Sequence, residues 1–95
     1  MRQMEICRKT VELYSEETST IVYYVMVDDV NNASSDLTLE VYGVVVTIIE
    51  SGETEIIPDV TCSKTDIFSL IELLAHHLVT PVTVSDVVSD WLCEN

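Results

Sequence analysis

Two segments of this 95-residue chain are apolar at most positions, and they constrain the fold more than any other feature. Residues 20–27 have the sequence TIVYYVMV, and residues 39–49 have the sequence LEVYGVVVTII. Such β-branched and aromatic residues favour strands. Successive side chains of a strand point to opposite faces, so both segments present apolar side chains to both faces of a sheet. An antiparallel sheet covered on one side alternates apolar with polar residues. We therefore expect the second face to be covered as well.

Three arrangements could cover that second face. The helices of the chain could divide between the two faces. A homodimer could pack sheet on sheet or pair its edge strands, which the exposed-patch argument favours. A different protein could also bind there. The residues expected at such an interface are Val22, Tyr24, Met26, Tyr42, Val44, Val46 and Ile48.

The first two thirds of the chain read as strands. We predict them at residues 10–14, 20–27, 39–49 and 54–60, with residues 1–9 as a flexible end and residues 28–36 as a long loop. Ser51 and Gly52 lie between two β-like runs, which predicts a tight hairpin at residues 50–53. Gly43, inside the third strand, marks a bulge or a close approach of the backbone.

The apolar pattern then changes to helical spacing. Ser63 and Asp66 have the spacing of a capping box, and the apolar residues that follow predict a helix over residues 64–78. Pro81 ends that pattern, and a second apolar stripe predicts a helix over residues 84–93. Strands followed by helices indicate an α+β domain, a four-stranded antiparallel meander followed by a C-terminal helical hairpin (ββββαα). The length indicates a single domain, residues 1–95.

The charge is strongly negative. Seventeen Asp and Glu face four Lys and Arg, a net charge of −13. Such a surface repels nucleic acid phosphates and anionic membranes, so we expect no direct binding to either. The charge keeps proteins apart in solution, and it could also form a face for a basic partner. A nucleic-acid mimic that occupies the groove of a DNA-binding protein is therefore one alternative function.

The cysteines indicate a reducing compartment. Cys7, Cys62 and Cys93 are odd in number and have no motif spacing, which argues against a disulfide framework. The first ten residues lack the apolar core of a signal peptide, and no apolar run is long enough to span a bilayer. We expect a cytoplasmic protein.

Part of the chain resembles a known family. The matching pieces are Tyr42–Val44, Ile57–Thr61, Val79–Pro81 and Val84–Leu92. They look like those of a family of short bacterial proteins known only as a domain of unknown function. The resemblance covers about half of the chain, from Tyr42 to Leu92. It implies the helical hairpin and a bacterial cytosolic setting, and it implies no catalytic residues.

No residues have the spacing of a catalytic or metal site. Adjacent His76 and His77 point about 100° apart on a helix and have no further ligands at zinc spacing. The segment from Asp29 to Glu40 lacks the glycine and the flanking helices of a calcium loop. Cys62 precedes a helix, but a reactive thiol also needs a cation or a histidine nearby. We therefore expect no catalytic, cofactor or metal residues.

These observations favour a non-catalytic protein-interaction or regulatory module that forms a homodimer or binds another protein. The alternatives are the nucleic-acid mimic and a small ligand-binding or thiol enzyme domain built around Cys62.

Overall fold

The structure of the chain is a computed structural model that describes residues 2–12, 17–32 and 37–94. Four antiparallel strands form one sheet in chain order, and two helices follow. The strands are β1 (Arg2–Glu12), β2 (Thr18–Asn32), β3 (Leu37–Ile48) and β4 (Thr54–Thr61). The helices are α1 (Lys64–His76) and α2 (Val84–Glu94). The predicted α+β meander with a C-terminal helical hairpin is confirmed.

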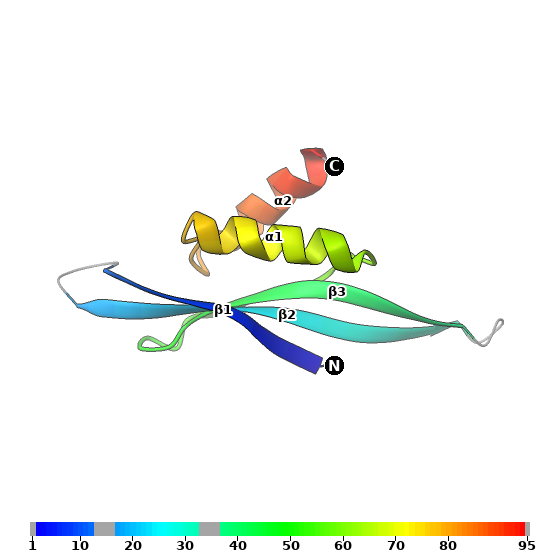
Figure 1. The fold of residues 1–95 in the computed structure, drawn as a ribbon, viewed down its shortest axis with the longest axis horizontal. Helices are drawn as coiled ribbons and strands as arrows, with labels where there is room; N and C mark the ends of the chain where they lie inside the picture. The colour runs from blue at the N-terminus through cyan, green and yellow to red at the C-terminus, as the bar shows by residue number, and fades with distance from the viewer. Residues whose placement is uncertain (1, 13–16, 33–36, 95) are drawn as a thin grey trace.

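Both helices lie on the same side of the sheet (Figure 1). Helix α1 packs across all four strands, and α2 packs against α1 and β4. Alternate residues of β2 and β3 meet the apolar faces of the helices in one core cluster. The helices are therefore not divided between the two faces. We call the face turned away from them the open face.

Tyr23 ties the helical hairpin to the sheet. Its side chain is fully buried, and its hydroxyl donates a hydrogen bond of 2.8 Å to the carbonyl oxygen of Val79, in the link between the helices. Burial raises the pKa of Tyr23 to about 12, with a smaller contribution from Cys7. The hydroxyl is therefore neutral and serves as a structural donor.

Strand β1 is longer than predicted. It begins at Arg2, so the residues expected to be a flexible end form most of this edge strand. Glu5 pairs with Tyr24 and Cys7 pairs with Tyr23, so Ile6 is an extra residue in a β-bulge. The bulge breaks the alternation of side chains by one position. A period-two pattern across it is therefore not visible in the sequence.

The predicted loop at residues 28–36 is largely strand. β2 continues to Asn32 and β3 begins at Leu37, while residues 33–36 lie outside the described part. Residues 28–32 and 37–41 pair with each other as an antiparallel ribbon, which we call the arm. The arm extends past both helices (Figure 1). Its Asp and Asn residues resemble a loop in composition, but cross-strand pairing determines its structure.

The turns at both ends of β4 follow the predicted chemistry. Gly52 has φ 77° and donates its backbone N–H to Ile48 at 2.9 Å, which confirms the tight hairpin. Ser63 caps α1 by accepting the backbone N–H of Asp66 at 3.2 Å. The helix ends at His76, two residues before the predicted end at residue 78. Leu78 adopts φ 51°, and its N–H donates a hydrogen bond to the carbonyl oxygen of Ala75. This left-handed residue closes the helix in a Schellman-type arrangement.

Candidate functional site

The structure separates the residues expected at the interface into two groups. Tyr42, Val44, Val46 and Ile48 lie in the core, beneath the helices. Val22, Tyr24 and Met26 point the other way, onto the open face. The two strands are apolar on both faces. Tyr24 pairs with Val45, so the β3 residue that lies beside these three side chains on the open face is Val45 and not Val44 or Val46. The four core residues therefore contact the helices of their own chain, and the candidate surface is the open face.

The centre of the open face is apolar and tightly packed within the sheet. Val22, Met26 and Val45 are buried although no helix covers them, and Tyr24 is half-buried between them. Ile56 of β4 pairs with Val45 and extends this strip to the edge, where it is 42% exposed. The strip is therefore an apolar surface with its most accessible side chain at the margin.

The charges at the centre of the open face cancel. On β1, the charged side chains on this side that pair with the strip from Val22 to Met26 are Glu5 and Arg8. Arg8 donates two hydrogen bonds to Glu5, of 2.7 and 3.1 Å, and the pair lies along β1. These bonds lower the pKa of Glu5 and raise that of Arg8, so both stay charged. In a chain of net charge −13, this neutral region is unusual.

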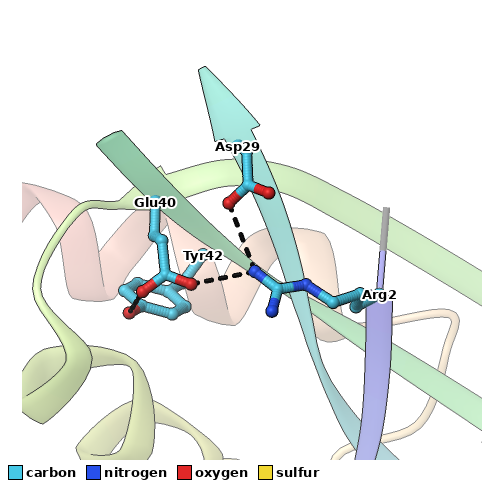
Figure 2. A network of polar contacts seen from close by, with 4 residues as sticks. All are labelled: Arg2, Asp29, Glu40 and Tyr42. Atoms are coloured by element: carbon cyan, nitrogen blue, oxygen red, sulfur yellow. Dashed lines mark hydrogen bonds and ion pairs between the residues drawn. The ribbon is translucent and has the colours of Figure 1, made fainter. Parts of the chain in front are cut away.

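The side of the arm that faces the helix layer is polar. Asp29 and Glu40 both lie on it and accept hydrogen bonds from Arg2, at 3.2 and 2.9 Å (Figure 2). The hydroxyl of Tyr42 donates to Glu40 at 3.2 Å. Burial raises the pKa of Tyr42, and the bond to Glu40 adds to that shift. One arginine thus joins β1 to both strands of the arm.

The opposite side of the arm carries exposed aliphatic side chains. Val30 and Leu39 are cross-strand partners on the open side, and they are 48% and 59% exposed. Val41 follows Leu39 on the same side and is half-buried. The arm therefore presents the carboxylates of Asp29 and Glu40 toward the helix layer. Its open side carries the three aliphatic side chains and the half-buried carboxylate of Asp28, the partner of Val41. Val30 and Leu39 are surface residues that the sequence pattern does not identify, because the composition of residues 28–36 predicts a loop.

Two hollows lie on the helix side. One, of about 370 Å³ between β1 and α1, is lined by Ile6, Cys7, Lys9, Ile71, Glu72, Ala75 and His76. The other, of about 220 Å³, is lined by Arg2, Met4, Val27, Glu40, Tyr42 and Lys64. The first brings a cysteine and a histidine to one hollow from opposite ends of the chain. Sequence spacing gives no sign of that proximity.

The candidate chemical residues do not come together. Cys62 is exposed just before the cap of α1, and neither hollow is lined by Cys62 or His77. The rings of His76 and His77 meet edge to face, with centroids 5.0 Å apart. Asp29 and Glu40, the ends of the segment tested as a calcium loop, bind Arg2. Within residues 2–12, 17–32 and 37–94, no group of three His, Cys, Asp or Glu residues could hold a metal ion.

Neither described helix is long and apolar enough to cross a membrane. No curated protein and no solved structure matches the chain. A family model described as "Family of unknown function (DUF6514)" matches residues 2–94. That match includes the segment from Tyr42 to Leu92 on which the resemblance rested, and it extends through β1 and β2. The chain belongs to this family of unknown function, DUF6514.

Proposed function

We propose that this chain is a non-catalytic protein-interaction module that binds its partner through the open face of the sheet. The arm carries this proposal. In an antiparallel sheet the apolar side packs on a second layer and the polar side faces water. On the arm, the exposed aliphatic side chains of Val30 and Leu39 lie on the open side, beside the half-buried Asp28. Asp29 and Glu40 lie on the other side and bind Arg2. The missing layer therefore belongs on the open face.

The distribution of acids gives less support to a nucleic-acid mimic. A mimic needs carboxylates that follow one face as phosphates follow a strand. Here each strand and each helix contributes acids, and Asp29 and Glu40 are already bound to Arg2. The centre of the open face is neutral. An acidic docking face for a basic groove is therefore the second candidate.

A thiol enzyme built around Cys62 is also less well supported. A reactive thiol needs a hollow in which it meets a base, and Cys62 is exposed and lines neither hollow. The three cysteines are free, which fits the reducing cytosol in which we propose that the protein acts.

Photo-crosslinking in the cell tests the proposal. A photoreactive amino acid replaces Leu39 on the arm, and in a matched chain it replaces Leu92 on α2, which is 47% exposed. The proposal predicts a discrete crosslinked product from position 39 and none, or a diffuse background, from position 92. If position 39 gives no product above that of position 92, the open face does not bind a protein.

A further inference from the structure

We infer that the partner on the open face is a second copy of this chain, packed sheet on sheet about a two-fold axis. This inference rests on the proposed function and names its occupant. A homodimer interface uses the same patch on both subunits, so the patch must be complementary to itself. The open face meets that requirement in charge, in size and in the placement of the arm.

Charge selects the occupant. Two copies each carry −13 and repel one another wherever their acids face. The centre of the open face holds Glu5 and Arg8, which neutralise each other at 2.7 Å. Two copies can therefore approach there without bringing net charge together. A basic protein, in contrast, would be attracted to the acidic surfaces elsewhere and would gain no electrostatic attraction from a neutral apolar strip.

The size of the face suits a stable dimer. A standard interface buries about 800 Å² on each partner. The sheet runs along the 55 Å dimension of the molecule (Figure 1). Four strands spaced about 4.8 Å apart make it roughly 15 to 20 Å wide where the eight residues of β4 run, and the two strands of the arm extend it further. The outline of the open face is therefore comparable with one side of a standard interface, and its most exposed apolar side chains lie at the margin and on the arm.

The arm gives the geometry. The arm extends past the helices (Figure 1), and Val30 and Leu39 on its open side are exposed to water. A two-fold axis that crosses the strands lays the arm of each copy over the sheet of the other. Leu39 and Val30, 59% and 48% exposed in one chain, then lose contact with water. The sheet of each copy thus covers the arm of the other, as in the aligned packing of two sheets.

Analytical ultracentrifugation tests this dimer with a matched pair of variants. Leu39→Glu places a carboxylate on the arm, and Leu92→Glu makes the same change on α2 at a side chain 47% exposed. Both residues are exposed in the single chain, so both variants should fold, which circular dichroism verifies. We expect the wild type at micromolar concentration to have twice the 10.7 kDa mass of one chain. Leu39→Glu should raise the dissociation constant on the order of tenfold or more, because a carboxylate is buried unpaired.

Leu92→Glu should leave the dissociation constant unchanged. A monomeric wild type, a dimer indifferent to Leu39→Glu, or one weakened equally by both changes would each overturn the inference. The crosslink from position 39 separates this failure from that of the proposed function. A product with a different protein refutes the second copy and leaves the interaction module intact, whereas no product refutes both.

Discussion

At the scale of single residues, Tyr23 shows how the fold depends on one buried polar group. Its ring lies in the core, and its hydroxyl donates a hydrogen bond to the carbonyl oxygen of Val79. Val79 lies in the link between α1 and α2, outside both helices. A buried carbonyl oxygen without a donor costs free energy. Tyrosine at this position therefore fixes where the helical hairpin sits on the sheet.

The change Tyr23→Phe should lower the free energy of unfolding by about 1–3 kcal/mol, since the ring still fits and the carbonyl oxygen of Val79 loses its donor. Urea denaturation of both proteins at one concentration measures the difference. Tyr24→Phe makes the same change on the opposite face and should cost less. An effect of Tyr23→Phe no larger than that of Tyr24→Phe would contradict the role of the hydrogen bond.

The raised pKa of Tyr23 predicts an alkaline limit to stability. The pKa is about 12 in the folded chain, against an ordinary value of 10.0. The folded state therefore binds this proton more tightly than the unfolded state. Its contribution is fully present below pH 10 and is lost as the pH rises toward 12. The difference in free energy of unfolding between the wild type and Tyr23→Phe should shrink between pH 10 and pH 12. A difference that stays constant from pH 8 to pH 12 would argue against a raised pKa of Tyr23.

At the scale of the elements, strand pairing decides what local pattern cannot. The cap of α1 and the hairpin at Gly52 were predictable because each depends on a few adjacent residues. The arm and the first half of β1 were not, because they form by pairing with distant segments, as Arg2 does with Val27 and Val30 with Leu39. Their stability is a property of segments far apart in the sequence.

The division of the predicted interface residues has the same cause. A one-residue change of register moves every side chain of a strand to the other face. Where both faces are apolar, the pattern cannot select the register. The sequence therefore predicted correctly that the strands are apolar on both sides, but it could not assign Val44 to the core and Val45 to the open face.

Gly43 provides a prediction at this scale. A Cβ added there would overlap the carbonyl oxygen of Ile57 and lie 2.9 Å from the Cα of Pro58, where the pairing of β3 with β4 shifts register. Alanine normally stabilises a strand relative to glycine by about 0.5–1 kcal/mol. Gly43→Ala should instead destabilise the fold by about 1–3 kcal/mol, because the β4 backbone must move. The sign of the change, measured by thermal or urea unfolding, is diagnostic, and a gain in stability would exclude the close approach.

At the scale of the whole molecule, the acids shape both stability and association. The net charge is −13, and the ion pairs of Arg2 and Arg8 are exposed, so each contributes little. Repulsion among the remaining carboxylates is therefore larger than the attraction within these ion pairs, so salt screens more repulsion than attraction. The neutral centre of the open face is the exception on which the proposed dimer depends.

Moderate salt should raise the melting temperature. At about 0.1 M salt the electrostatic screening length is near 10 Å, which weakens the repulsion between carboxylates within and between chains. Thermal melts in low and moderate sodium chloride measure this effect. The same addition should tighten the dimer in sedimentation. A melting temperature that is unchanged or lower in salt would mean that the acids are too dispersed to matter.

In the proposed dimer, a second copy covers the open face. The most direct test is methyl NMR of the wild type at micromolar concentration with a soluble paramagnetic agent that broadens the signals of water-exposed groups. The methyl groups of Val30, Leu39 and Ile56 should be protected, while those of Val82 and Leu92, exposed on the helical side, should be broadened. Equal broadening of both sets would show that the open face meets water and that no second copy covers it.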